Sequence, residues 1–312
     1  MQPKAKNPPA AARRPVLARL EGACKRYGAV TALDRLDLAV HAGEVLAVLG
    51  ANGAGKTTAL GLLTGRIGPD AGRAELFGRD PREPVARRGI GVMLQDGDLP
   101  DTLRVHEHVR LFSSYYPAPR HVDDTLALAG LTELAGRSYA ALSGGQKRRV
   151  QFALAICGRP PLLFIDEPTV GLDVEARRAF WEVIRRLRAE GTAIVLTTHY
   201  LEEADALADR IVLMAAGRVL ADDTPARIKG LAAGKRVHAR SRVPAATVSG
   251  WPEADAVQLR EGRFEVATAQ PEALLRRWLA ADDRLQDLEV RPLPLEDAVL
   301  ALTARKTLEN AA

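Results

Sequence analysis

Three short stretches of this chain carry residues whose types and spacing suit chemistry on phosphate groups. The first, GANGAGKT at residues 50–57, matches the pattern G-x-x-x-x-G-K-[ST]. Its glycines let backbone N–H groups converge on phosphate oxygens, and the helix expected to follow adds positive potential. Lys56 would reach the outer phosphates of a nucleotide, while Thr57 offers a hydroxyl to Mg²⁺. We therefore predict a nucleotide phosphate site here, with a Gly-rich turn as the structural alternative.

The second stretch, PLLFIDEP at residues 161–168, is an apolar strand that ends in two carboxylates. Asp166 would hold Mg²⁺ through water, which suits a hard ion that keeps much of its hydration. Glu167 would polarise an attacking water as a general base. A single acid is explained equally well as a cap of the next element. Two acids after such a strand, downstream of a phosphate loop, favour a hydrolytic site.

The third stretch, LSGGQ at residues 142–146, opens a predicted helix. Ser143 and Gln146 are spaced as in a capping box. The paired glycines Gly144 and Gly145 leave the first amide groups uncovered by side chains, so this N-terminus would also hold an anion. Taken alone, the stretch is equally consistent with an ordinary helix start. The other two stretches, in this order, favour the anion site.

In this order the three stretches resemble those of the ATP-binding cassette family, the nucleotide-binding subunits of ABC transporters, and the similarity spans residues 16–228. The resemblance implies that two copies face head to tail. ATP would then lie between the phosphate loop of one copy and the LSGGQ helix of the other. ATP binding would close this dimer, and hydrolysis would release it.

The resemblance also implies roles for four residues outside the three stretches. Tyr27 in KRYG is similar to the aromatic that stacks on adenine, and Gln95 in GVMLQ to the glutamine that contacts Mg²⁺ and the attacking water. Asp173 in VGLD stands where the family has an interface aspartate. His199 in LTTH resembles the switch histidine that contacts the γ-phosphate. Three of them also have an ordinary interpretation: Tyr27 as a surface aromatic, Gln95 as a loop polar group and His199 as a satisfied histidine at a strand end.

The predicted site is thus a set of residues with three roles. The catalytic residues are Glu167, His199 and Gln95, and the Mg²⁺ ligands are Thr57, Gln95 and Asp166. The ATP-binding residues are Gly50, Ala51, Asn52, Gly53, Ala54, Gly55, Lys56, Thr57, Thr58, Tyr27, Ser143, Gly144, Gly145, Gln146 and Asp173.

The elements that must position these residues alternate between strand and helix. Residues 16–40 alternate as two strands of an antiparallel edge sheet, and residues 44–50 form a near-continuous apolar run typical of a strand buried on both faces. Strands at PLLFID and TAIVLTTH alternate with helices further on. This pattern predicts an α/β P-loop NTPase cassette with a mixed sheet covered by helices, and a helical lobe at about residues 96–158.

The chain is long enough for a large domain and a smaller one. We expect a disordered tail at residues 1–15, the ATP-binding domain at residues 16–230, and a small C-terminal α+β accessory domain at residues 235–312. The accessory domain reads as strands KRVHARSRV and AVQLREGRFEVAT, a helix from Pro271, a strand DLEVRPL and a terminal helix from Leu295.

Composition excludes several classes of protein. Hydrophobic residues make up 47% and charged residues 27%, as in ordinary globular proteins. Every charge-free stretch is much shorter than the roughly 20 apolar residues of a spanning helix, and the N-terminus carries no signal-peptide pattern. The net charge of +5 is spread along the chain, which indicates a solvated surface rather than a nucleic-acid interface. Cys24 and Cys157 lack metal-ligand spacing and suit a reducing cytoplasm.

These features together predict which partners the chain needs. We expect a homodimer or paired cassette, separate multi-span membrane permease subunits, a peripheral location at the cytoplasmic face of the inner (plasma) membrane, and no nucleic acid. The segment DGDLPDTLRVHEHVRLFSSYYP resembles the part of exporter cassettes that receives coupling helices. Residues 171–219 look like bacterial subunits that export drugs or polysaccharides, and the tail PLPLEDAVLALT is similar to the end of the accessory domain in drug exporters.

Two alternatives stay open. Importers share every catalytic motif, so the direction of transport depends on the flanking resemblance alone. Soluble ABC ATPases that act on ribosomes or nucleic acid use the same motifs, although they usually carry two cassettes or long coiled-coil insertions. GTPases and kinases have no use for LSGGQ, and the sequence has no N-K-x-D string for guanine. The cargo is not named by the sequence.

Overall fold

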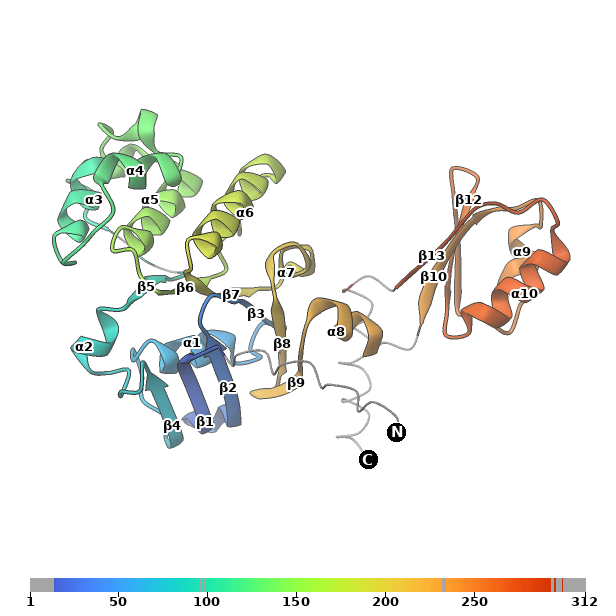
Figure 1. Ribbon diagram of the computed structural model, residues 1–312, viewed down its shortest axis with the longest axis horizontal. Helices are drawn as coiled ribbons and strands as arrows, with labels where there is room; N and C mark the ends of the chain where they lie inside the picture. The colour runs from blue at the N-terminus through green and yellow to red at the C-terminus, as the bar shows by residue number, and fades with distance from the viewer. Residues whose placement is uncertain are drawn as a thin grey trace, which may run out of the picture. The chain divides into compact units, whose positions relative to one another are not determined.

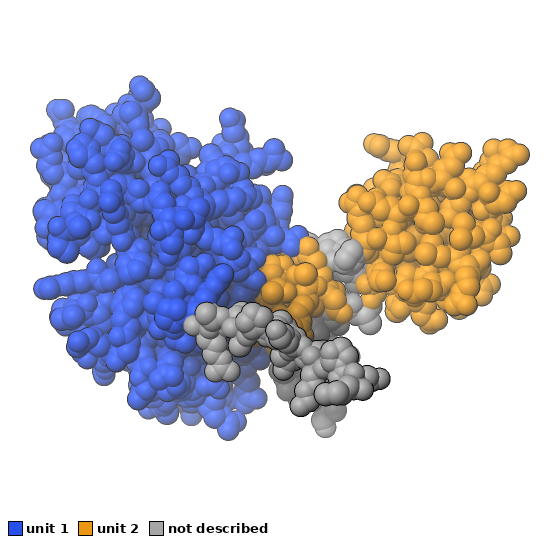
Figure 2. All heavy atoms as spheres, in the orientation of Figure 1, with its two compact units in different colours: residues 1–210, 214–219 blue, residues 211–213, 220–312 orange. Residues whose placement is uncertain are grey.

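The computed structural model describes residues 14–95, 97, 99–231, 234–292, 295 and 299. It divides into two compact units, residues 1–210 with 214–219 and residues 211–213 with 220–312 (Figure 2). The domain boundary expected at residues 230–234 stays a prediction. Most of the expected N-terminal tail and nearly all of the expected terminal helix lie outside the described residues.

A three-stranded antiparallel sheet, in the order β2-β1-β4, forms the edge of the first unit. The hairpin predicted for its first two strands is confirmed, and it turns at Gly28, whose φ of 59° suits glycine. The third strand was not predicted, because its sequence AGRAEL has no clear apolar alternation. The bounds are β1 Val16–Tyr27, β2 Val30–His41 and β4 Ala71–Leu76.

A six-stranded sheet in the order β5-β6-β7-β3-β8-β9 runs through the middle of the cassette (Figure 1). The neighbours β5 and β6, β6 and β7, and β7 and β3 are parallel. Every residue of β3, β6 and β7 is buried, which explains their continuous apolar sequences. The bounds are β3 Val45–Leu49, β5 Ile90–Met93, β6 Leu162–Asp166, β7 Ala193–Thr198, β8 Arg210–Ala215 and β9 Arg218–Asp223.

Helices connect these strands; α1 and α3 to α7 were predicted, whereas α2 and α8 were not. Three of them, α3, α4 and α5, group together in Figure 1 at the place of the expected helical lobe, and α5 also packs against β5. Among the described residues, no helix combines the length and apolar character needed to cross a membrane. The bounds are α1 Lys56–Leu63, α2 Pro84–Arg87, α3 Val105–Ser113, α4 Val122–Leu128, α5 Gly144–Ile156, α6 Val174–Ala189, α7 Leu201–Leu207 and α8 Pro225–Leu231.

The second unit contains an antiparallel sheet in the order β11-β12-β10-β13, with α9 between β10 and β11 and α10 between β12 and β13. Trp278 of α10 is fully buried against Phe264 at a ring-centroid distance of 5.4 Å, so the unit has a core of its own. The run AVQLREGRFEVAT, expected as one strand, is a hairpin that turns at Glu261 and Gly262, both with positive φ. The bounds are β10 Lys235–Arg240, α9 Ala245–Ser249, β11 Ala256–Arg260, β12 Arg263–Thr268, α10 Pro271–Ala281 and β13 Gln286–Pro292.

Candidate nucleotide site

The parallel strands bring most of the predicted site to one edge of the central sheet. Strand registers align Leu49 with Thr198 and Asp166 with Thr197. The carboxyl ends of β3, β6 and β7 therefore lie side by side, and β5 adds a fourth end next to β6. The loops that follow these four strands contain the phosphate loop, Glu167, His199 and Gln95, so residues far apart in sequence become neighbours.

At two positions of the phosphate loop, the surrounding backbone leaves room for glycine and for no larger residue. A Cβ at Gly50 would lie 2.5 Å from the carbonyl oxygen of Met214, and one at Gly55 would lie 2.6 Å from that of Ala32. Gly53 and Gly55 also have φ values of 82° and 100°, which glycine adopts without strain. The loop then ends at α1, whose first amide groups are free for an anion.

Lys56 is held inside this loop by its own backbone. Its side chain is 6% exposed, and Nζ donates to the carbonyl oxygens of Gly50 at 2.7 Å and Ala51 at 3.3 Å. The same Nζ lies 3.9 Å from Oε1 of Glu167. A buried ammonium needs such partners. The predicted phosphate ligand and the predicted general base are therefore in contact.

The end of β6 is fixed by hydrogen bonds to β7. Asp166 is buried, and its Oδ1 accepts from the hydroxyl of Thr197. The amide of Glu167 donates to both the carbonyl and the hydroxyl oxygen of Thr197 at 3.1 Å. Glu167 has a φ of 47°, a left-handed backbone that costs a residue with a Cβ roughly 1–2 kcal/mol. These bonds hold that strained backbone and aim the carboxylate away from the strand.

The Glu167 carboxylate lies between two nitrogen groups. Oε1 faces Lys56, and Oε2 lies 3.2 Å from Nδ1 of His199. The His199 ring, 42% exposed, stacks at 4.2 Å on Tyr200. One nitrogen of the imidazole is thus engaged with the carboxylate, while the ring as a whole stays accessible. The arrangement is suited to orienting a general base.

Three side chains at this edge suit a magnesium ion. Asp166 supplies a buried carboxylate, and Thr57 and Gln95 lie in exposed segments at the start of α1 and after β5. Within the described ranges, no cluster of three or more His, Cys, Asp or Glu side chains is arranged to hold a metal ion. Mg²⁺ needs no such cluster, because it binds one or two protein oxygens together with substrate phosphates and water. The donor set fits that ion.

Tyr27 lies at the end of β1, with its side chain 51% exposed. It pairs with Val30 across the hairpin, and Ala32 of the same hairpin contacts Gly55 of the phosphate loop. Lys25 Nζ lies 5.8 Å from the centre of the ring. Tyr27 is therefore an exposed aromatic on β1, in the hairpin whose second strand borders the phosphate loop.

The helix start at Ser143 has the predicted capping box. The amide of Gln146 donates to the Ser143 hydroxyl at 3.3 Å, and the amide of Ser143 donates to Oε1 of Gln146 at 3.0 Å. Nothing lies within 4 Å of a Cβ at Gly144, and one at Gly145 meets only the side chain of Leu172 at an ordinary 3.6 Å. Neither glycine has positive φ. The chain itself therefore gives no steric reason for these glycines.

Two predicted groups are not brought to the phosphate loop. Among the residues that the structure describes, no hydrogen bond or ion pair joins residues 143–146 to residues 50–57. Asp173 caps α6, where it accepts from the amide of Ala176 at 2.8 Å, and it is exposed. Both groups lie at the surface, available to something outside this chain.

Three residues beside the site were not predicted from the sequence. Thr197 bonds to both acids of β6, and Arg148 donates to the backbone beside Gln95 and Glu167. Glu203 is buried beside Trp181, and burial raises its pKa from the ordinary value of 4.5. The available signal was the pair of threonines that ends an otherwise apolar strand; the contacts of Arg148 and the burial of Glu203 depend on segments distant in the sequence.

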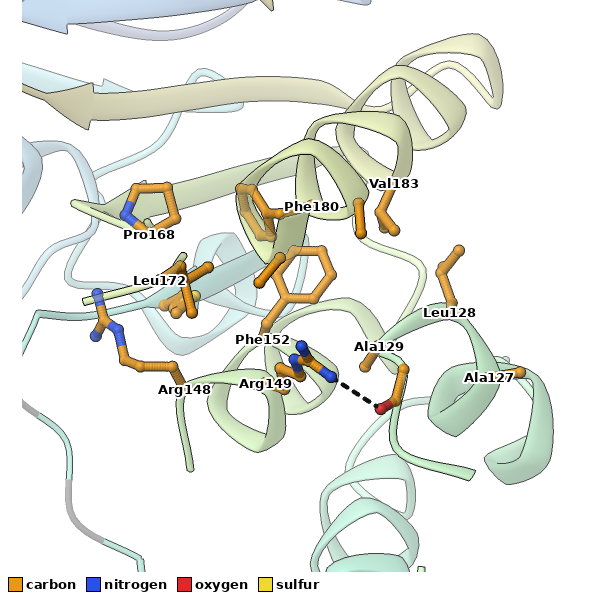
Figure 3. A pocket seen from close by; sticks show the side chains of 14 residues that line it. Ala127, Leu128, Ala129, Arg148, Arg149, Phe152, Pro168, Leu172, Phe180 and Val183 are labelled. Carbon is orange, nitrogen blue, oxygen red and sulfur yellow. Dashed lines mark hydrogen bonds between the residues drawn. The ribbon is translucent and has the colours of Figure 1, made fainter. Parts of the chain in front are cut away.

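A cavity of about 240 Å³ lies between α5 and α6, away from the phosphate loop. Figure 3 shows Phe152 and Phe180 facing each other in its wall, with ring centroids 5.0 Å apart. Its lining is apolar except for Arg148 and Arg149. The helical lobe and the core are thus incompletely packed on this side.

Comparison with known proteins agrees with the geometry. Residues 33–170 match the model of a family described as ABC transporter. A daunorubicin resistance ATP-binding protein of Streptomyces coeruleorubidus is 38% identical over 93% of this chain and 95% of its own length. A Nod factor export ATP-binding protein of Rhizobium sp. (strain N33) is 36% identical over 92% of this chain and 97% of its own length.

Solved structures give the same fold. The ATP-binding subunit of an ABC transporter superposes with a TM-score of 0.63 at 29% identity, covering 69% of this chain and 92% of that one. A dimeric bacterial ABC transporter cassette superposes with a TM-score of 0.61 at 25% identity, covering 66% of this chain and 98% of that one.

Proposed function

Because this chain belongs to the ABC transporter family as an ATP-binding subunit that hydrolyses ATP, we propose that it powers an exporter through separate membrane subunits. One observation carries the proposal. The similarity to the daunorubicin resistance protein continues over almost the whole chain, well beyond the cassette. Importers share the catalytic motifs, so the residues outside those motifs are the ones that bear on direction.

The hydrolytic step would use groups that already touch one another. An attacking water would lose its proton to Glu167 as its oxygen bonds to the γ-phosphorus. The bond from that phosphorus to the bridging oxygen would break, leaving ADP and phosphate. His199, 3.2 Å from the carboxylate, would orient it and face the γ-phosphate. Gln95, at the end of the neighbouring strand, would contact the same water.

Binding of ATP would first release Lys56 from its contacts in the chain. The ammonium now donates to Gly50 and lies near Glu167. Phosphate oxygens are stronger acceptors than a carbonyl oxygen, so they would take over this donor. Glu167 would then be free to accept a proton. Bound Mg²⁺ would neutralise phosphate charge, held by Thr57, Asp166 and Gln95.

The exposed helix start and Asp173 support a dimer as the working form. Ser143, Gly144 and Gly145 would face the phosphates of ATP held by a second cassette, and Tyr27 would stack on the base in its own subunit. The open space around Gly144 is what an approaching phosphate requires. The membrane subunits would hold the pair at the cytoplasmic face of the inner membrane and would form the path for the cargo.

Co-purification tests the partner. The full chain, tagged and expressed in its native host, is extracted in mild detergent, and the proteins that remain bound are identified. We expect a protein with several hydrophobic spans, enriched over a control pull-down. Recovery with ribosomes after salt washing, without such a protein, would overturn the transporter proposal and favour the soluble ATPase.

Glu167→Gln tests the catalytic cycle and has the largest expected effect on turnover. The amide keeps the shape but cannot take a proton, so we expect hydrolysis to fall about 100-fold or more, within the range that general bases contribute. ATP should still close the dimer, and size-exclusion chromatography with ATP should show a stable dimer of Glu167→Gln. Glu175→Gln, an exposed acid in the first turn of α6, is the matched control. Normal turnover by Glu167→Gln would remove Glu167 from this role.

A further inference from the structure

We propose that Arg148 is a positioning residue that ties the LSGGQ helix to the catalytic backbone of its own subunit. Through this guanidinium, a movement of α5 imposed by ATP on the second cassette would reset Gln95 and Glu167. The proposal rests on the proposed dimeric ATPase and adds to it a link between the two nucleotide sites.

The contacts of Arg148 span two loops of the site. Nη1 donates to the carbonyl oxygens of Leu94 at 2.6 Å and Gln95 at 2.8 Å. Nη2 donates to those of Asp166 at 3.0 Å and Glu167 at 2.7 Å. A planar guanidinium can serve two pairs of acceptors at once, whereas an ammonium cannot. One side chain therefore fixes the backbone after β5 relative to the backbone after β6.

These bonds complete the restraint on Glu167. Its amide is held by Thr197 of β7, and its carbonyl is held by Arg148 of α5. The left-handed φ of 47° lies between the two. A residue in a sparsely populated conformation persists only where its surroundings determine it. If α5 shifts, the carbonyl anchor shifts with it, and the direction of the carboxylate changes.

The place of Arg148 on α5 makes it a link between sites. It lies five positions after Ser143, about 8 Å along the helix axis at 1.5 Å per residue. A helix this short moves as a rigid rod. The end at Ser143 would face ATP bound by the second copy, whereas Arg148 touches the catalytic backbone of this copy. A displacement of the helix at Ser143 would therefore move Arg148 as well.

The packing around Arg148 leaves room for such movement. Arg148 also lines the cavity between α5 and α6, so open space lies beside its side chain. Figure 3 shows Arg148 and Arg149 extending in different directions from α5. Arg149 donates only a long 3.5 Å bond to Gly130 inside the lobe, and it is exposed. Of these two arginines, Arg148 spans from the lobe to the catalytic strand.

Steady-state hydrolysis by the full chain gives the first test. We expect Arg148→Ala to lower kcat at least tenfold, with the affinity of a fluorescent ATP analogue for a single copy and the unfolding midpoint close to the parent values. Arg148→Lys should restore little of the loss. Arg149→Ala is the matched control and should stay within twofold of the parent. Full activity of Arg148→Lys would show that charge alone suffices and would overturn the bridging role.

Mixed dimers separate positioning from simple support of α5. One copy carries Glu167→Gln, so only the other site hydrolyses ATP. When Arg148→Ala is in the copy with the intact Glu167, we expect at least a tenfold loss relative to the dimer without Arg148→Ala. When Arg148→Ala is instead in the Glu167→Gln copy, which lends its LSGGQ helix to the active site, most activity should remain.

The outcomes of the mixed-dimer experiment distinguish a positioning role of Arg148 from a purely structural one. An equal loss in both arrangements, or a greater loss in the second, would mean that Arg148 only stabilises the helix, and would overturn the proposal. Hydrolysis is measured as a single turnover, because the Glu167→Gln site should hold the dimer closed; absence of that turnover when both copies retain Arg148 would contradict the proposed ATPase cycle itself.

Discussion

The two glycine-containing segments of the candidate site differ in what surrounds them. In the phosphate loop, a Cβ at Gly50 or Gly55 would collide with backbone of the same chain. At the start of α5, Gly144 faces open space and Gly145 makes only an ordinary contact. Packing within the chain therefore restricts the phosphate loop to glycine at these positions. In the described part of the chain, no such packing restricts the start of α5, where a group outside the chain would have room to approach.

The polar groups follow the same division. Lys56, Asp166 and Glu167 are buried and already partnered within the chain. Ser143 and Gln146 exchange the two capping hydrogen bonds, and Asp173 caps its own helix at the surface. Under the proposed function, these buried groups would form one half of an ATP site within a single copy, and the surface groups would form the half offered to a second copy. A single copy would then bind nucleotide but require a second copy to act on it.

Of the substitutions that distinguish the phosphate loop from the start of α5, Lys56→Ala should have the largest effect. The buried ammonium of Lys56 would form charge-assisted hydrogen bonds to two phosphates of ATP. Its loss should weaken ATP binding to a single copy at least 100-fold. Ser143→Ala should leave that affinity unchanged, since its hydroxyl would serve ATP on the other copy. Isothermal titration calorimetry at a concentration that keeps the protein monomeric measures both. Equal losses would mean that one copy uses both segments.

Gly50→Ala and Gly144→Ala should differ in stability and activity. The first places a methyl group 2.5 Å from the Met214 carbonyl, and such overpacking costs about 1–3 kcal/mol of unfolding free energy. The second adds a favourable helix former in open space, worth about 0.5–1 kcal/mol of stabilisation. Hydrolysis should nevertheless fall in Gly144→Ala, because its methyl group would cover amides offered to phosphate. Denaturant titration and turnover are measured on both; full activity of Gly144→Ala would contradict the partner site.

Much of the site could be predicted because its residues directly follow strands that are recognisable in the sequence. Continuous apolar runs at β3, β6 and β7 identify buried parallel strands, and such strands bring the residues after them to one edge. The capping box of Ser143 follows from local spacing and was confirmed. These features depend on residues near in sequence, where the chain geometry is fixed by a few dihedral angles.

The rest depended on contacts between distant segments. Arg148 is one of three consecutive basic residues, and nothing local distinguishes it from Arg149, yet only Arg148 reaches the carbonyls beside β5 and β6. The strand β4 pairs with β1 despite its polar sequence, because tertiary pairing overrides weak local preference. Burial of Glu203 likewise depends on α6 lying against α7, which spacing along the chain does not specify.

The smallest expected effect concerns the stability contributed by the buried acid Glu203. Burial raises the pKa of Glu203 above 4.5, against weaker opposing hydrogen bonds from Thr198 and Trp181. Protonated Glu203 is therefore favoured in the folded state, and its contribution to stability is present at low pH and is lost as pH rises through the folded pKa. Glu203→Gln should remove this loss.

The measurement is the free energy of unfolding of Glu203→Gln relative to the parent across pH. The two should be similar below pH 4.5, and the advantage of Glu203→Gln should grow as pH rises, by about 1.4 kcal/mol for each tenfold difference in proton affinity between folded and unfolded chains. Glu202→Gln, whose parent side chain is 72% exposed, should show no such trend. A constant offset for Glu203→Gln would mean that the pKa of Glu203 is the same in the folded and unfolded chains, and would contradict the raised pKa.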